Sequence, residues 1–323
     1  MKAITYRAYG SPDVLEYEDV EQPSPGDDDV LLRVRAASVN PRDWHFMRGE
    51  PYFVRMMTGL SKSTAARLGT DVAGQVEAVG KNVRQFKAGD EVFGWCRAAL
   101  AEYALATHSA VVGKPAAVTF DQAACVATAG LTALQALRDK GGLRAGQKVL
   151  INGAAGGVGT FAVQIARSFG ADVTGVCSTR NLDLVGSIGA GRVIDYTRQD
   201  FTAGPQRYDL ILDSVGNHSM LACKRALSSG GTYVAVGGPS GRGMIGPLSR
   251  VIAGPLLSRV VNRRLTMHLT RPSQADLVAM RDFMEAGKVT PVVDRRYRLS
   301  EAAEAIRYLE QGHARGKVVI TVE

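Results

Sequence analysis

A glycine-rich turn between two apolar segments is the sequence feature that most constrains the fold. Val149, Leu150 and Ile151 have the composition of a short buried parallel strand, and four glycines follow between positions 153 and 159. A helical segment then starts near Val158, and a second strand follows at 172–177. This order predicts a dinucleotide-binding βαβ unit, whose pyrophosphate binds backbone amides at the helix N-terminus. The expected contacts are Ala155, Gly156, Gly157 and Val158.

The residues that end the second strand predict NADPH as the cofactor. An NAD-specific site normally has a carboxylate about 20 residues after the glycines, where it binds the adenosine ribose. This chain instead has hydroxyls and a guanidinium there, which suit a 2′-phosphate; the segment is Cys177, Ser178, Thr179 and Arg180. Tyr196, after the next short strand, could add a phenolic hydroxyl. The alternative is that Arg180 and Tyr196 are ordinary solvent-exposed loop residues.

The pattern along the chain predicts an α/β protein with two domains. The first 120 residues are β-rich, with turns of glycine, proline and aspartate, which is typical of a barrel-like domain. After Asp121 a helical pattern, interrupted at Gly130, leads into βα units that predict an open, doubly wound parallel sheet of about six strands. Segments 274–288 and 300–313 predict amphipathic helices, and 316–322 predicts a closing strand that returns to the first domain. We expect one domain of residues 1–122 plus 266–323 and a dinucleotide domain of 123–265.

Composition narrows the class of protein further. No segment approaches the roughly 18 to 20 unbroken apolar residues of a membrane helix, and the chain begins with an alternating strand, which predicts a cytoplasmic protein. The four cysteines are far apart and form no CxxC pair, so neither a disulfide framework nor a zinc knuckle is indicated. The net charge of +8 could attract nucleic acid, but no aromatic platform accompanies the arginines of the last third. We therefore expect no nucleic-acid partner.

Five motifs together resemble the medium-chain dehydrogenase/reductase superfamily, and within it the zinc-independent, zeta-crystallin-like quinone oxidoreductase branch. They are NPRDWHFMRG at 40–49, GTDVAGQVEAVG at 69–80, TAGLTALQAL at 128–137, AAGGVG at 154–159 and HARGKVVI at 313–320. The resemblance covers essentially the whole chain. It implies a GroES-like β-barrel domain, a Rossmann domain and a homodimer.

The same resemblance argues against a metal. Asn40 occupies the position of the first cysteine ligand of the zinc alcohol dehydrogenases, and Thr70 occupies that of their histidine. An amide and a hydroxyl do not make a zinc site. The structural zinc lobe is also missing, because residues 90–108 contain Cys96 as their single cysteine. We predict no bound metal.

Without zinc the site cannot easily stabilise an alkoxide, so the predicted substrates are those that spread the negative charge left by hydride addition. Quinones and α,β-unsaturated carbonyl compounds satisfy that condition. Two alternatives remain open at this point. One is an enoyl thioester reductase, and the other is a catalytically quiet NADPH-binding protein that binds RNA or another partner.

The resemblance also implies residues beside the nicotinamide and the substrate. Asn40 and Thr128 would offer amide and hydroxyl donors, and Tyr52 could line the pocket or donate a proton. The alternatives are a turn asparagine, a helix-capping threonine and an exposed loop tyrosine. Asp43 is expected to be structural, fixing Arg48 or a loop backbone.

Two loops that follow predicted strands are expected at the carboxyl edge of the sheet, where ligands bind in doubly wound folds. Their expected cofactor contacts are Asp213, Ser214, Val215, Gly237 and Gly238. Ordinary tight turns are the alternative. Lys317 is expected to contact the cofactor phosphates, although a lysine that protects a strand edge would look the same.

Overall fold

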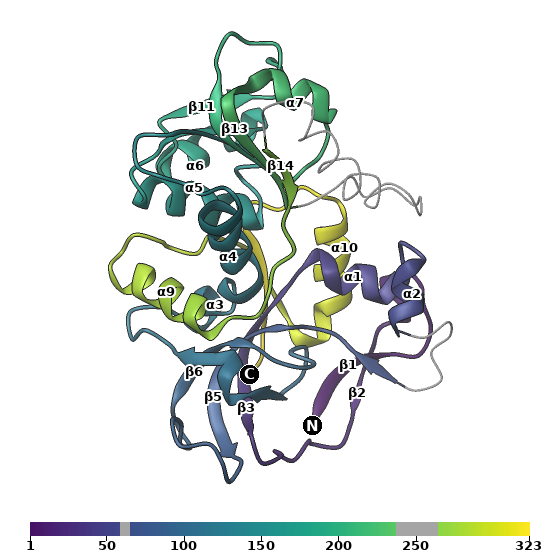
Figure 1. Ribbon diagram of the computed structural model, residues 1–323. Helices are drawn as coiled ribbons and strands as arrows, with labels where there is room; N and C mark the ends of the chain where they lie inside the picture. Colours follow the sequence, from purple (N-terminus) through teal and green to yellow (C-terminus); the bar gives the residue numbers. More distant parts are fainter. Residues whose placement is uncertain (59–64, 237–263) are drawn as a thin grey trace. The chain divides into compact units, whose positions relative to one another are not determined.

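The computed structural model describes residues 1–58, 65–236 and 264–323, and Figure 1 shows their helices and strands. The chain divides into two compact units, one of residues 1–131 with 272–323 and one of residues 132–271. We expected the domain boundaries at 122/123 and 265/266, whereas the units change at 131/132 and 271/272. Gly237 and Gly238 lie outside the described residues, as do all residues between them and β14.

The first unit contains two β-sheets. A small sheet has the strand order β2-β1-β4, and a larger one has the order β15-β16-β3-β5-β6-β8, with β7 also pairing with β3. The strands are β1 (Lys2–Tyr6), β2 (Glu16–Asp19), β3 (Asp29–Val39), β4 (Ala66–Arg67), β5 (Asp71–Val79), β6 (Glu91–Trp95), β7 (Tyr103–Thr107), β8 (Val111–Gly113), β15 (Val293–Arg298) and β16 (Lys317–Thr321). Strand β16 pairs antiparallel with β3, which confirms that the closing strand returns to the first domain.

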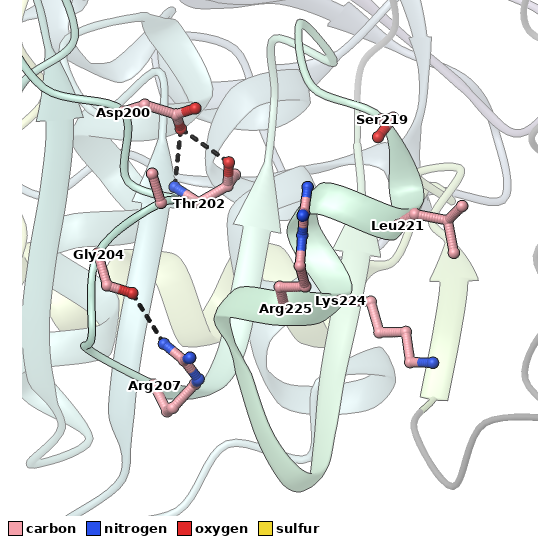
Figure 2. Close-up of a pocket in the computed structure, with 9 residues that line it drawn as sticks. Asp200, Thr202, Gly204, Arg207, Ser219, Leu221, Lys224 and Arg225 are labelled. Carbon is pink, nitrogen blue, oxygen red and sulfur yellow. Dashed lines mark hydrogen bonds between the residues drawn. The ribbon is translucent and has the colours of Figure 1, made fainter.

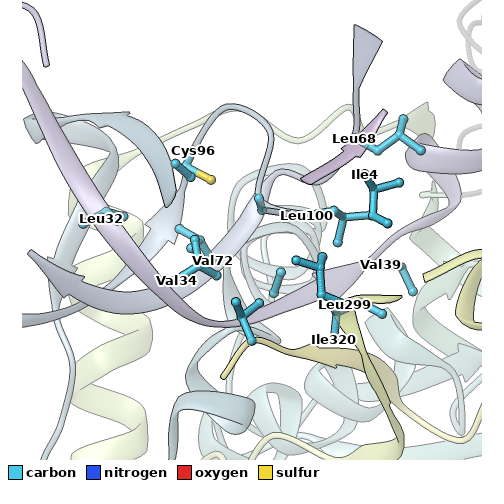
Figure 3. Packing of buried hydrophobic residues seen from close by; sticks show 14 of the residues in the cluster. Ile4, Leu32, Val34, Val39, Leu68, Val72, Cys96, Leu100, Leu299 and Ile320 are labelled. Carbon is cyan, nitrogen blue, oxygen red and sulfur yellow. The ribbon is translucent and has the colours of Figure 1, made fainter. Parts of the chain in front are cut away.

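An apolar core holds the strands of this unit together. Figure 3 shows its centre, where side chains from β1, β3, β5 and β16 pack with Leu100 and Leu299. Burial of each aliphatic side chain of this size contributes about 1.5–3 kcal/mol. The core therefore joins the first strands of the chain to its last strand.

Among the described residues, six α-helices belong wholly or partly to this unit. They are α1 (Pro41–Arg48), α2 (Phe53–Thr58), α3 (Phe120–Ala123), α4 (Val126–Gln135), α9 (Gln274–Glu285) and α10 (Ala302–Glu310). Helices α9 and α10 confirm the two predicted amphipathic segments. The predicted interruption at Gly130 is wrong, because α4 continues through it and the break falls at Ala124 and Cys125. An interior glycine costs a helix only about 1 kcal/mol relative to alanine, which the burial of the surrounding α4 residues offsets.

The second unit is a six-stranded parallel sheet with the order β11-β10-β9-β12-β13-β14, as the βα pattern predicts. Its strands are β9 (Lys148–Asn152), β10 (Asp172–Cys177), β11 (Arg192–Asp195), β12 (Tyr208–Asp213), β13 (Leu227–Ala235) and β14 (Arg264–Met267). Its helices are α5 (Gly157–Ser168), α6 (Leu182–Ser187) and α7 (Met220–Ala226), and a π-helix (Ala136–Lys140) extends α4. The strand order reverses between β9 and β12, which is where doubly wound sheets bind their ligands.

The carboxyl ends of the central strands are level with one another. Asp213 pairs in register with Asn152 of β9 and with Ala235 of β13, and Ala235 pairs with Met267 of β14. The loops that leave these strands therefore start from one edge of the sheet. None of the helices in the described ranges is long and apolar enough to cross a membrane.

Candidate functional sites

The turn after β9 has the geometry of a phosphate-binding loop. Gly153 has a positive φ of 85°, and its amide and that of Ala154 both donate to the carbonyl of Val176, at 3.2 and 3.0 Å. A Cβ atom at Gly159 would lie 2.0 Å from the carbonyl oxygen of Gly153. Only glycine fits there, so the turn folds back tightly against the first turn of α5.

Helix α5 directs its positive end toward the space above this turn. Gly156 is its N-cap, and the first intrahelical bond runs from the amide of Thr160 to the carbonyl of Gly156, at 2.9 Å. The amides at the start of a helix have no intrahelical acceptor and carry partial positive charge. Gly156, Gly157 and Val158 are partly exposed. Ala155 is buried, so a contact from it would use its backbone. These residues fit a pyrophosphate.

The loop after β12 is built around Asp213. This carboxylate is completely buried, and its Oδ1 accepts the amides of Val215 and Gly216, at 3.0 and 2.8 Å, and the side-chain amide of Asn152, at 2.9 Å. Its Oδ2 accepts the hydroxyl of Tyr233 at 2.6 Å. Asp213 therefore shapes the loop from inside, while Val215 is exposed.

Ser214 joins this loop to the glycine turn. Its hydroxyl donates to the carbonyl of Asn152 at 2.8 Å, and a Cβ atom at Gly153 would lie 2.4 Å from its Oγ. The two loops leave neighbouring strands at the switch point and contact each other. The predicted cofactor contacts of the two loops are thus brought together at one sheet edge.

The end of β10 contains a feature that the sequence argument missed. Asp195, the last residue of β11, accepts a hydrogen bond from the Thr179 hydroxyl at 2.6 Å, and this bond lowers the pKa of the carboxyl. Thr197 also donates to Asp195, and the guanidinium of Arg198 lies 3.7 Å away. A carboxylate is therefore present beside the predicted 2′-phosphate position. The signal for it was the VIDYT segment, in which only Tyr196 was considered.

The other residues of the β10 end differ in accessibility. The Cys177 side chain is buried, and this burial raises the pKa of its thiol to about 11. The hydroxyl of Ser178 accepts the side-chain amide of Asn181 at 3.1 Å. Arg180 and Tyr196 are exposed, as is Thr179, so these side chains can reach a ligand from solvent.

The first unit contains a buried polar cluster centred on Asp71, at the start of β5. This side chain has no exposed surface. Its Oδ1 accepts the Thr128 hydroxyl at 2.5 Å, and its Oδ2 accepts the Thr128 amide at 3.2 Å and the Asn40 side-chain amide at 3.1 Å. The Ser38 hydroxyl lies 3.3 Å from the same oxygen, and its nearer acceptor is the carbonyl of Ala124 at 2.8 Å. Asp71 thus connects β3, β5 and α4.

Lys317 supplies the positive charge of this cluster. It is 4% exposed, and its ammonium donates to Asn40 Oδ1 at 2.5 Å and to the carbonyl of Val39 at 3.3 Å. Its distance to Asp71 Oδ2 is 3.6 Å. Lys317 is therefore not a solvent-facing strand-edge lysine. Its ammonium, which we expected to contact the cofactor phosphates, is bound to Asn40 and Val39.

Asp43 fixes the backbone on the other side of Asn40. Its Oδ2 accepts the Asn40 amide at 2.7 Å and its Oδ1 accepts the Gly69 amide at 3.1 Å, while burial raises its pKa to about 6. The structural role expected for Asp43 is confirmed for the loop backbone. It is wrong for Arg48, which pairs with Glu310 at 2.5 Å.

The three residues predicted beside the substrate are not in one place. Asn40 and Thr128 both bond to Asp71, and Thr128 is partly exposed whereas Asn40 is buried. Tyr52 is 54% exposed, and its ring lies 5.2 Å from the guanidinium carbon of Arg55. Within the described ranges no hydrogen bond joins Tyr52 to the cluster. Sequence reasoning missed Asp71, although a lone carboxylate before the apolar strand VAGQV was visible in the GTDVAG motif.

The second unit also has a hollow of about 890 Å³, which Figure 2 shows. It lies between the connection after β11 and helix α7, and none of the predicted site residues lines it. Several of its polar groups are bonded locally. Asp200 Oδ1 accepts the Thr202 hydroxyl at 2.8 Å, and Arg207 donates to the carbonyl of Gly204 at 2.9 Å. We do not assign a ligand to it.

Comparison with known proteins finds relatives over nearly the whole chain. Residues 26–136 match the family model described as alcohol dehydrogenase GroES-like domain, and residues 188–320 match the one described as zinc-binding dehydrogenase. A chloroplast envelope quinone oxidoreductase homolog from Arabidopsis thaliana is 33% identical over 99% of this chain and 98% of its own length. A 2-methylene-furan-3-one reductase from Solanum lycopersicum is 34% identical over 99% of this chain and 79% of its own length.

A solved structure extends this similarity to three dimensions. The quinone oxidoreductase from Coxiella burnetii matches with a TM-score of 0.88 at 31% identity, over 100% of this chain and 99% of that chain. Fold and sites together define a two-domain, dinucleotide-dependent oxidoreductase, with a GroES-like domain and a Rossmann-like parallel sheet. The chain belongs to the medium-chain dehydrogenase/reductase superfamily, in its quinone oxidoreductase branch.

The description of the second family model names zinc, but Asn40, which the resemblance puts at the position of the first zinc ligand, does not fit a zinc ion. Asn40 Oδ1, the atom that would have to act as a ligand, is already bound to the ammonium of Lys317. A second cation there would be repelled by that ammonium. The described residues contain no group of three or more histidine, cysteine, aspartate or glutamate side chains placed to hold a metal.

Proposed function

We propose that this protein reduces quinones or α,β-unsaturated carbonyl compounds with NADPH and without zinc. The observation that carries this proposal is the buried contact of the Lys317 ammonium with Asn40 and Asp71, in a chain that also has a glycine turn with the geometry of a phosphate-binding loop. When bound, the reduced nicotinamide supplies the hydride. The chain binds and orients the reactants, which is where most of its contribution to the rate would come from.

The proposed substrate class depends on how the first unit can stabilise the negative charge left by hydride addition. Its buried carboxylates, Asp43 and Asp71, accept hydrogen bonds from backbone and side-chain donors and are not exposed. Neither is placed to protonate a substrate from the surface, so we propose that solvent supplies the proton. An acceptor that delocalises its charge over several atoms needs no metal to stabilise that charge.

The preference for NADPH is supported by Arg180 and Tyr196, both exposed near the end of β10. The carboxylate of Asp195 argues in the other direction, but its charge is shared with Thr179, Thr197 and Arg198. We propose that Arg180 decides the balance, because a guanidinium forms strong charge-assisted bonds with a phosphate.

The decisive experiment follows cofactor oxidation by the purified, metal-free protein. The assay offers NADPH or NADH with ortho- and para-quinones, conjugated enones and crotonyl thioesters, and metal content is measured on the same sample. We expect turnover of quinones or enones with NADPH and no dependence on zinc. Preference for the thioester would instead identify an enoyl thioester reductase. Turnover that requires stoichiometric zinc, or no oxidation with any acceptor, would refute the proposal.

We also propose a homodimer and a cytoplasmic location. Strand β14 ends the sheet order of the second unit, and its outer edge pairs with no other described strand, so a second copy could extend the sheet there. Sedimentation of the purified protein tests the dimer, and cell fractionation tests the location. A monomer at micromolar concentration would contradict the first proposal.

A further inference from the structure

The hydrogen bonds around Asp71 have a direction, and that direction limits what the site can offer a ligand. An ionised carboxylate only accepts hydrogen bonds. The amides of Thr128 and Asn40 and the ammonium of Lys317 converge on Oδ2, which is the environment of a carboxylate anion. The Thr128 hydroxyl, 2.5 Å from Oδ1, must therefore donate its only proton to Asp71. Toward any further group, its oxygen can only accept.

Asn40 is constrained in the same way. Its Oδ1 accepts from Lys317, and its Nδ2 donates to Asp71 Oδ2 at 3.1 Å and to the carbonyl of Ser38 at 3.4 Å. The amide orientation is fixed by an ammonium on one side and a carboxylate on the other. Because Asn40 is also buried, its amide is not available to a ligand. The amide that we expected to be a donor to the ligand donates to Asp71 and to the carbonyl of Ser38.

We propose that Asp71 is a positioning residue that turns the Thr128 hydroxyl into a hydrogen-bond acceptor, so that the ligand presents an N–H or O–H group there and not an oxyanion. This inference rests on the proposed function, since the ligand is the dinucleotide or its substrate. Two sources could supply such a group. One is the carboxamide N–H of the nicotinamide, and the other is a hydroxyl of the ribose or of the substrate.

Replacing Asp71 by asparagine should reverse the polarity. The side-chain amide of Asn40 and the backbone amide of Thr128 both donate to the Oδ2 position, and the Lys317 ammonium lies 3.6 Å from it, so the oxygen of an asparagine must lie there. Its NH2 group then lies at the Oδ1 position and donates to Thr128 Oγ1. The Thr128 hydroxyl then no longer donates to residue 71, and its O–H group can point toward the ligand. The site then offers a donor where the wild-type protein offers an acceptor.

The test compares two cofactors across matched variants. The variants are Thr128→Val, Asp71→Asn and, as a control, Thr202→Val, which removes an equivalent bond between Thr202 and Asp200 of 2.8 Å in the second unit. Fluorescence titration gives the Kd of NADPH and of its reduced 3-acetylpyridine analogue, in which a methyl ketone replaces the carboxamide and both riboses are unchanged. Steady-state assays with a quinone give kcat and KM separately.

We expect Thr128→Val to weaken a ground-state affinity about tenfold, the value of one hydrogen bond, with little change in kcat. If the carboxamide is the donor, the analogue binds the wild-type protein about tenfold more weakly than NADPH does, and Thr128→Val removes this difference. Asp71→Asn should then favour the analogue. If a hydroxyl is the donor, the wild-type protein binds both cofactors equally, and Thr128→Val weakens both cofactors or raises the quinone KM. Thr202→Val should change none of these values.

A fall in kcat with unchanged Kd and KM in Thr128→Val would overturn the inference, because a donor to an oxyanion acts in the transition state. Unchanged binding and kinetics in that variant would overturn it as well. Should Asp71→Asn fail to fold, Thr128→Val still decides between these results. A wild-type protein that binds no NADPH would refute the proposed function and this inference with it, whereas one that binds NADPH regardless of Thr128 would refute the inference alone.

Discussion

Replacing Lys317 by methionine tests whether the buried ion pair holds the first unit together. Methionine has similar length and removes the charge, leaving Asp71 buried with its remaining donors. The ammonium lies 3.6 Å from Asp71 Oδ2, and the side chains are 4% and 0% exposed. At an effective dielectric constant of about 20, two unit charges at that distance attract each other by about 5 kcal/mol.

Measured losses on removing one partner of a buried pair are about 3–5 kcal/mol, because the other charge is left uncompensated. We therefore expect Lys317→Met to reduce the free energy of unfolding of the first unit by about 3–5 kcal/mol. A typical domain has 5–15 kcal/mol in total, so the variant should fold but unfold at much lower denaturant. Combining Lys317→Met with Asp71→Asn should recover part of the loss, since the double variant leaves no buried charge without its partner.

The assay can be restricted to this unit. Both tryptophans of the chain, Trp44 and Trp95, lie in the first unit, so their fluorescence during urea unfolding reports on it. A two-domain chain does not unfold in one step, and this local probe avoids assigning the whole transition to one value. A loss below about 1 kcal/mol for Lys317→Met, or additive losses in the double variant, would show that the pair is not coupled and would refute the reasoning.

Three further predictions concern the cofactor turn, the phosphate contact and pH. Gly159→Ala should abolish NADPH binding in titrations, because its methyl group would lie 2.0 Å from the Gly153 carbonyl oxygen. Arg180→Ala should lower kcat/KM for NADPH roughly tenfold and leave that for NADH unchanged, since an exposed charge-assisted bond contributes on the order of 1 kcal/mol; equal losses with both cofactors would contradict this. Burial raises the pKa of Asp43 from 3.8 to about 6, so the folded state binds this proton more tightly than the unfolded state. Its stabilisation is complete below pH ~4 and is lost as pH rises through about 6, and urea titrations of Asp43→Asn should lack this decline.

The fold and the cofactor turn were predictable because their signals are local. A strand, four glycines and a helix lie within about 20 residues of one another, and the chemistry of each position is visible in the sequence. The βα alternation likewise gave the six-stranded parallel sheet. The sequence predicted a helix break at Gly130, whereas the break lies before α4. Helix propensity penalises Gly130 but does not show that the residues around it are buried.

The polar cluster was only partly predictable, because its members come from distant segments. Asn40 and Thr128 were found by resemblance, but their connection through Asp71 depends on the pairing of β3 with β5 and on the place of α4. Nothing in the sequence shows that a carboxylate will accept the hydrogen bond of the Thr128 hydroxyl. Asp195 was missed for a similar reason, since it reaches Thr179 only through the parallel pairing of β10 with β11.

The same pairing geometry makes the end of the chain part of the site. Val318 of β16 is in register with Val39 of β3, so Lys317 comes opposite Asn40. A slip of one residue would turn every side chain of β16 to the other face of the sheet and remove the ammonium from the cluster. The glycines of the cofactor turn are neighbours in sequence, whereas the ammonium of Lys317 joins the Asp71 cluster only when the last strand has paired with the third. The orientation of Asn40 and Thr128 is therefore a property of the completely folded first unit. Truncation before β16 should abolish this orientation, although it removes no residue of the cofactor turn.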